Sequence, residues 1–80
     1  MENASHLLSR ITAQPGVLTG KPTIRGMRIS VEQILKALAA GISTQELLQE
    51  YPVLEEADIL ACLAYATKLV EQERVYPLSA

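Results

Sequence analysis

Apolar residues recur at helical spacing through the last fifty residues of the chain. The first such segment follows Ser30, which can cap a helix with Gln33 at the capping-box position, and it stops at Gly41, which suits the position after a helix. Its apolar residues fall at i, i+3, i+4 and i+7, and they are Val31, Ile34, Leu35 and Leu38. This pattern predicts a helix that begins after Ser30, ends at Gly41 and buries one face.

A short helix and a long helix follow. Ser43 and Glu46 have the spacing of a second capping box, and the short helix that they start is expected to end near Glu50. The third helix is predicted over residues 55–74, with an acidic first turn at the positive end of the helix dipole. Its apolar side consists of Ile59, Cys62, Leu63, Ala66, Leu69 and Val70. We expect the core shared by the three helices to contain Leu35, Leu38, Leu47, Ile59 and Leu63.

The first thirty residues carry turn signals instead of helical spacing. Pro15-Gly16 suits the two central positions of a type II turn, and a short strand is expected just before it, over residues 10–13. The chain is therefore predicted to be one mainly helical domain over residues 1–80. Its parts are an arm of strand, turn and hairpin, a core of three helices, and a tail, over residues 1–30, 31–74 and 75–80.

The stretch TIRGMRIS, residues 23–30, predicts a tight hairpin with Gly26-Met27 as its loop. In this register the residues that face each other are Ile24 with Ile29 and Arg25 with Arg28. Like charges directly opposite each other are destabilising, so the arginine face requires an anion. That anion is either a DNA phosphate or a carboxylate from this chain, from a second copy or from a partner protein.

Composition narrows the class of protein. A chain of 80 residues buries only about 60 % of the surface that it exposes when unfolded, so we expect self-association, with a homodimer as the simplest form. No segment reaches the length of about 18 apolar residues that a membrane span requires, and a soluble cytoplasmic protein is expected. Cys62 is the single cysteine and no Cys/His cluster has metal-ligand spacing, so we expect no metal and no cofactor.

The charges divide unevenly along the chain. Residues 1–31 hold four basic residues and one acidic residue, a net charge of +3, whereas residues 32–80 hold three basic and eight acidic residues, a net charge of −5. An anionic partner would therefore approach the arm. Our candidate nucleic-acid or anion-binding residues are Lys21, Arg25, Arg28 and Arg10. A structural interpretation stays open, in which the arginines bind backbone carbonyls or carboxylates of this same chain.

Residues 11–66 resemble the domain-of-unknown-function family 433. The resemblance rests on GKPTIRG, on RI leading into a helix, on AAGIS before the short acidic-apolar helix, and on YPVL and ADILACLAYA. It implies a three-helix, helix-turn-helix core of the homeodomain-like kind with a short N-terminal β element. It also implies a relation to antitoxins of the VapB type.

Two functions of different classes follow from these observations. In the first, the protein is an antitoxin-like regulatory module that dimerises, binds a toxin resembling a PIN-domain nuclease, and contacts operator DNA through its basic arm. In the second, it is a structural or protein-interaction domain that does not bind DNA. The helix that would enter the DNA major groove begins with Glu55, Glu56 and Asp58, which phosphate would repel. We expect no enzymatic activity, because no constellation of residues for nucleophilic or acid–base chemistry stands out.

Overall fold

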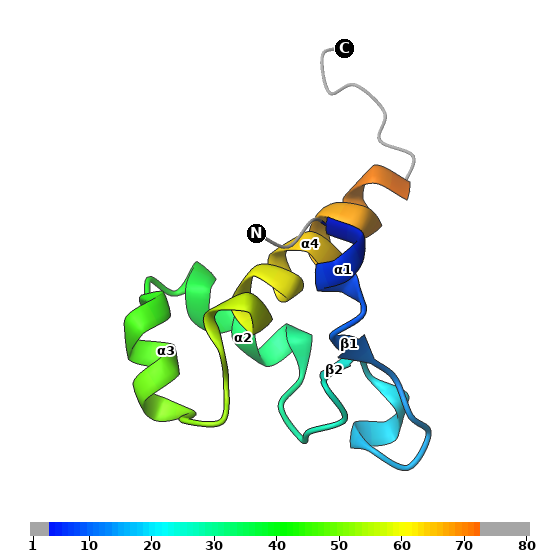
Figure 1. Cartoon of the computed structure of the whole chain (residues 1–80), viewed down its shortest axis with the longest axis horizontal. Helices are drawn as coiled ribbons and strands as arrows, with labels where there is room; N and C mark the ends of the chain where they lie inside the picture. The colour runs from blue at the N-terminus through cyan, green and yellow to red at the C-terminus, as the bar shows by residue number, and fades with distance from the viewer. Residues whose placement is uncertain (1–3, 73–80) are drawn as a thin grey trace.

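The computed structural model describes residues 4–72. These residues form four α-helices, one 3-10 helix and a small two-stranded sheet near the N-terminus (Figure 1). The elements in chain order are α1 (Ala4–Leu8), β1 (Ile11–Thr12), the 3-10 helix η1 (Leu18–Gly20), β2 (Thr23–Ile24), α2 (Val31–Ala39), α3 (Thr44–Glu50) and α4 (Glu56–Gln72). The prediction of a mainly helical domain with a short N-terminal β element is confirmed. The tail expected at residues 75–80, and Arg74 at the expected end of the third helix, lie outside the described residues.

Helix α1 was not expected from the sequence. It has five residues, too few to be stable alone, and it packs against α4. The chain leaves it in a turn in which the hydroxyl of Ser9 donates to the carbonyl of His6 at 2.6 Å. The helical conformation of α1 therefore depends on its packing against α4, a distant helix, and a local sequence pattern does not show such a contact.

Strand β2 lies between two neighbours. Its register with β1 is antiparallel and pairs Ile11 with Ile24 and Thr12 with Thr23. On the other side Thr23 forms an isolated antiparallel bridge with Ser30. The strand expected over residues 10–13 is thus confirmed as β1. It pairs with β2, the first strand of the hairpin segment.

The hairpin turn differs by one residue from the prediction. The amide of Ile24 donates to the carbonyl of Ile29 at 3.1 Å, so these two residues face each other as expected. The chain reverses through Arg25 and Gly26, however, with φ of 48° and 73°, and the amide of Met27 donates to the carbonyl of Ile24 at 2.8 Å. Two positive φ angles at the centre are typical of a type I′ turn. Arg25 is therefore a turn residue and not a strand residue opposite Arg28.

The turn at Pro15-Gly16 lies where the sequence placed it but is not of type II. The amide of Val17 donates to the carbonyl of Gln14 at 2.9 Å, while Gly16 is not among the described residues with positive φ. A type II turn requires positive φ at its third residue. The left-handed conformation occurs instead a few residues later, in η1, where φ is 48°, 54° and 81° at Leu18, Thr19 and Gly20.

The helix caps agree closely with the sequence. The hydroxyl of Ser43 accepts from the amide of Glu46 at 3.1 Å and the Glu46 carboxylate accepts from the Ser43 amide at 2.9 Å, a complete capping box. The Ser30 hydroxyl accepts from the Gln33 amide at 3.0 Å. The side chain of Gln33 donates instead to the hydroxyl of Tyr51 at 2.9 Å, so α2 has half of the expected box. Gly41, just after α2, has φ of 93°.

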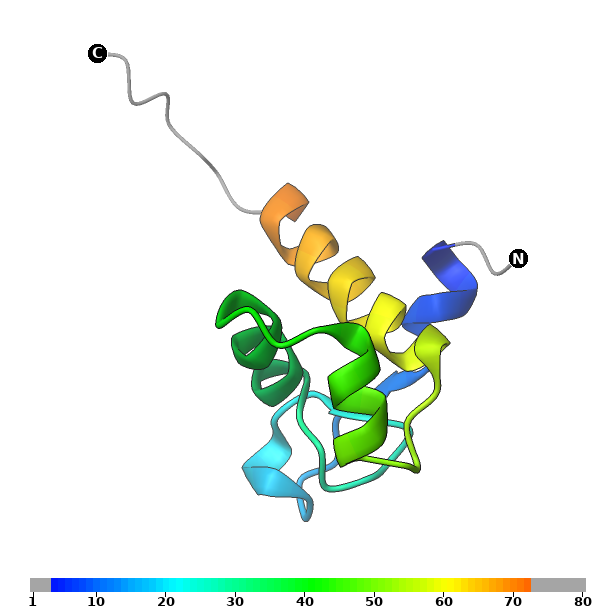
Figure 2. The same ribbon diagram turned by 90° about the vertical axis from the view of Figure 1, so that its left-hand side faces the viewer.

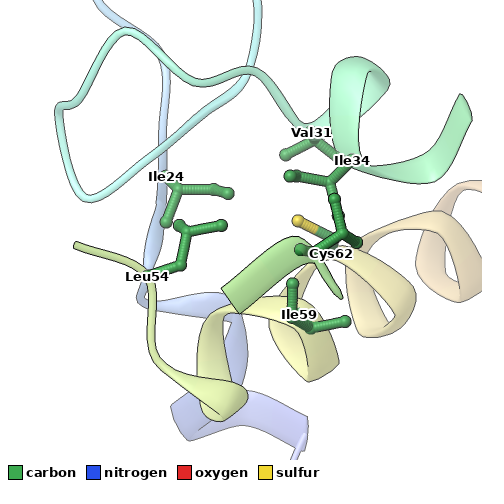
Figure 3. Packing of buried hydrophobic residues seen from close by; sticks show 7 residues of the cluster. Ile24, Val31, Ile34, Leu54, Ile59 and Cys62 are labelled. Carbon is green, nitrogen blue, oxygen red and sulfur yellow. The ribbon is translucent and has the colours of Figure 1, made fainter. Parts of the chain in front are cut away.

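The hydrophobic core lies between β2, α2 and the first turns of α4 (Figure 3). Leu47 and Ile59 are buried in it as predicted, and Leu35 and Leu38 pack against it while partly buried. Leu63 is 44 % exposed, so its assignment to the core is wrong. The side of α4 that continues the core runs through Cys62 and Tyr65 instead. The buried residues of the core are Ile24, Val31, Ile34, Leu47, Leu54, Ile59 and Cys62.

Candidate functional site

Asp58 is a fully buried carboxylate in the first turn of α4. Glu55 precedes this helix, at the position where a Ser or Thr cap would satisfy the first amides. The Asp58 carboxylate supplies the other half of a capping box, because its Oδ2 accepts a hydrogen bond from the amide of Glu55 itself at 2.8 Å. A carboxylate at this end of a helix is also favoured by the helix dipole.

Arg25 binds Asp58 with two parallel hydrogen bonds. Its Nε donates to Oδ1 at 3.0 Å and its Nη2 donates to Oδ2 at 2.8 Å. Nη2 also donates to the carbonyl of Val53 at 2.9 Å, just before α4. A left-handed backbone costs a residue other than glycine about 1–2 kcal/mol. The bidentate contact offsets that cost, which explains why an arginine is tolerated in this turn.

Arg10, which directly precedes β1, binds the same carboxylate. Its Nη1 donates to Oδ1 of Asp58 at 3.1 Å and to Oε1 of Glu55 at 2.7 Å. The backbone carbonyl of Arg10 accepts from the amide of Arg25 at 2.7 Å. We call Asp58, Arg10, Arg25 and Glu55 the arginine cluster. It fixes the strand β1 and the hairpin turn to the beginning of α4.

The electrostatics of the arginine cluster favour its charged forms. Burial disfavours the Asp58 carboxylate, but hydrogen bonds from Arg25, the Glu55 amide and Arg10 outweigh burial and lower the pKa of Asp58. The hydrogen bond to Asp58 raises the pKa of Arg25. Burial, with the nearby charge of Asp58, raises the pKa of the Cys62 thiol to about 12. The thiol is therefore protonated and unreactive at neutral pH.

The four candidate anion-binding residues do not form a single patch. Arg10 and Arg25 lie in the arginine cluster, facing α4. Lys21 binds Glu32 on α2 at 3.1 Å, and both side chains are about half exposed. Arg28 is exposed and has no hydrogen bond or ion pair with another described side chain. Contact of these cations with nucleic acid stays a prediction, with Lys21 and Arg28 as the more accessible of the four.

Asp58 is not among the four site residues that the sequence predicts. From the sequence, its charge predicts a favourable interaction with the helix dipole and repulsion of phosphate, but it indicates no particular partner within the chain. A signal was present, because Asp58 lies three residues after Glu55, the spacing of a capping box. Its arginine partners lie 33 and 48 residues away in the chain, where no local pattern connects them.

An apolar face lies open on the other side of α4. A groove of about 520 Å³ runs between α2 and α4, and its lining is mostly aliphatic. Beside it, a hollow of about 330 Å³ lies on the outer side of α4. Figure 2 shows that the C-terminal half of α4 extends beyond the other helices. We call this surface the α2/α4 face and define it by Leu35, Leu63, Ala66, Leu69 and Val70.

Two negative findings bear on the class of site. In residues 4–72 no group of three or more His, Cys, Asp or Glu side chains is placed to bind a metal ion. Across the same part of the chain, no helix is both long enough and apolar enough to cross a membrane.

The fold defines a small helical domain with a β arm, and comparison with known proteins supplies its family. A family model described as "Protein of unknown function (DUF433)" matches residues 11–66, and the chain belongs to this family. The chain is also similar to the uncharacterized protein y4eO of Sinorhizobium fredii (strain NBRC 101917 / NGR234), with 34 % identity over 56 residues. The match covers 70 % of this chain and 25 % of that relative, so the chain spans about a quarter of the relative's length. No solved structure matches the chain.

Proposed function

We propose that the domain is a non-catalytic interaction module that works as a homodimer, in an antitoxin-like regulatory role with a nuclease resembling a PIN-domain toxin as its protein partner. The observation that carries this proposal is the α2/α4 face. Three large apolar side chains that α4 contributes to this face are between 44 % and 61 % exposed, and they are Leu63, Leu69 and Val70. Contiguous apolar surface of this kind marks sites of protein contact.

The buried polar chemistry of the domain supports a structural role for the arginine cluster. Both oxygens of Asp58 are bound by donors of the same chain. No described buried side-chain nitrogen or oxygen lacks a partner. These groups stabilise the arm against α4, so we expect the homodimer contact on the apolar surface and not at the arginine cluster.

Binding to operator DNA is the second candidate function. It is favoured by Arg28, which is exposed and pairs with no other described side chain, and by Lys21, whose side chain is 57 % exposed. Each phosphate contact contributes a slope of about −0.9 to log affinity against log salt. Arg10 and Arg25 are bound to the buried carboxylate of Asp58, whereas Lys21 pairs only with the half-exposed Glu32, so a dimer would offer Lys21 and Arg28 from each copy. A binding isotherm on double-stranded DNA that does not weaken with added salt would exclude this candidate.

Sedimentation equilibrium of the purified chain tests the proposed function. At micromolar concentration we expect twice the chain mass of 8.7 kDa. A monomer that keeps its helical circular dichroism at that concentration would contradict the homodimer. The regulatory role is tested separately, by asking whether a nuclease resembling a PIN domain is encoded beside the protein and adding the domain to it: inhibition of RNA cleavage supports the role, and the absence of such a neighbour or unchanged cleavage contradicts it.

A further inference from the structure

We propose that the α2/α4 face is covered by the same face of a second copy of this chain, with Val70 of each copy lying in the groove of the other. This inference rests on the proposed function, because it names the surface that the homodimer uses. It also implies that a toxin or DNA is bound elsewhere on the domain.

The shape of the face makes it complementary to itself. The groove and the outer hollow share two lining residues, Ala66 and Val70. Val70, 61 % exposed, therefore stands on a crest with a depression on each side, and Ala66 leaves room for close approach. In a two-fold interface both copies use the same patch, so a crest beside a groove supplies both halves of the contact.

The face also continues the core of the domain. Leu35 and Tyr65 pack against the buried core and at the same time line the groove. Ile59, in the first turn of α4, is 2 % exposed, whereas Leu63, one turn later, is 44 % exposed. The body of the domain thus covers the beginning of α4 and leaves the following turns open (Figure 2). A second copy would extend the core along the part of α4 that this chain does not cover.

Charges at the edges of the face favour a second copy over a strongly charged partner. On the α2 edge, Glu32 binds both Lys21 and Lys36 at 3.1 Å, which leaves this edge with a net charge of +1. On the opposite edge, Glu71 lines the outer hollow and pairs with no other described side chain. In a two-fold dimer with each crest in the opposite groove, Glu71 of one copy lies toward Lys36 of the other. The symmetry forms this pair two times, once at each end of the interface. DNA would instead meet an apolar floor with edges of mixed sign.

A pair of matched variants tests this interface by sedimentation velocity over a range of concentrations. Val70→Glu places a carboxylate on the crest, whereas Val53→Glu places one on a valine that is 60 % exposed and lies before α4, away from the face. We expect Val70→Glu to raise the dimer dissociation constant at least about 100-fold, because two carboxylates would be buried without partners. Val53→Glu should dimerise as the unchanged chain does.

The outcomes separate this inference from the proposed function. A monomeric unchanged chain would contradict the homodimer itself. If the unchanged chain and Val70→Glu dimerise equally, the homodimer stands and the interface lies elsewhere, which overturns the inference. If Val70→Glu loses its helical circular dichroism, Thr67→Arg, in the outer hollow, replaces it with the same expectation.

The charge pairing has its own test. Lys36→Glu and Glu71→Lys should each weaken the dimer, and the double variant should recover affinity, because the pair is then reversed across the interface. A double variant that dimerises no better than the weaker single variant would overturn the pairing of these two residues.

Discussion

Replacing Asp58 by Asn is the most informative change to the arginine cluster. Asn keeps the size of the side chain and one acceptor oxygen, so the amide of Glu55 still has a partner for its hydrogen bond. The change removes the negative charge that lies between Arg10 and Arg25. The two guanidinium groups then share no buried counter-ion, and the arm loses its strongest attachment to α4.

The magnitude follows from the burial of each partner. Removing one member of a buried ion pair costs about 3–5 kcal/mol, because the remaining charge is left uncompensated. The side chains of Arg10 and Arg25 are 21 % and 37 % exposed, so water compensates part of that loss. We therefore expect Asp58→Asn to lower the free energy of unfolding by about 2–3 kcal/mol. At typical values per residue, a domain of this size has about 4–12 kcal/mol in total.

Urea unfolding followed by circular dichroism measures this loss as a lower midpoint at unchanged slope. Glu55→Gln is the control, because Glu55 accepts from the same Nη1 of Arg10 at 2.7 Å but has a side chain that is 60 % exposed. An exposed pair contributes at most about 1 kcal/mol. Equal losses in the two variants, or a loss below about 0.5 kcal/mol for Asp58→Asn, would refute the argument that burial makes Asp58 decisive.

Three further predictions concern the same fold. Folding lowers the pKa of Asp58, so its contribution to stability is present above the unfolded pKa of about 3.9 and is lost as pH falls through the folded pKa. Acid titration should therefore destabilise the unchanged chain more steeply than Asp58→Asn. Cys62, with a pKa of about 12, should react with a thiol reagent at neutral pH only as fast as the domain opens, so a rate near that of a free thiol would contradict its burial. Ser43→Ala should cost about 1 kcal/mol in urea unfolding by removing the cap of α3, whereas Gln45→Ala, on the exposed side of α3, should stay within about 0.5 kcal/mol.

Local signals in the sequence predicted the local features well. The capping residues Ser30 and Ser43, and the strand before Pro15, lie where the pattern placed them. The two caps depend on hydrogen bonds between residues three positions apart, which a sequence records directly, whereas the strand forms by pairing Ile11 with Ile24. Helix α1 was missed because five residues owe their conformation to packing against α4 and not to their own propensity.

The phase of α4 and the site were predicted less well, for a related reason. An apolar face on a helix predicts that this face is buried, but it does not show whether the same domain or a partner buries it. Ile59 and Leu63 belong to the same expected stripe, yet the first is buried within the domain and the second is not. Likewise, the basic character of the arm was correctly noted, while the identity of the carboxylate that Arg10 and Arg25 meet depends on how the arm folds against α4.

Three basic residues of the arm, Arg10, Lys21 and Arg25, pair with carboxylates of the helical part of the same chain. These ion pairs limit the charges that are available to bind a partner. Arg25 and Arg10 reach Asp58 across 33 and 48 residues of sequence, so the position of the arm depends on its contacts with α4. The arm and the beginning of α4 therefore form one cooperative unit, fixed by ionic contacts that no partner is needed to complete. The later turns of α4 have the opposite character, since their apolar side chains are exposed. A partner that covered those turns would bury apolar side chains that the domain itself leaves exposed, and its binding to the folded chain would add stability.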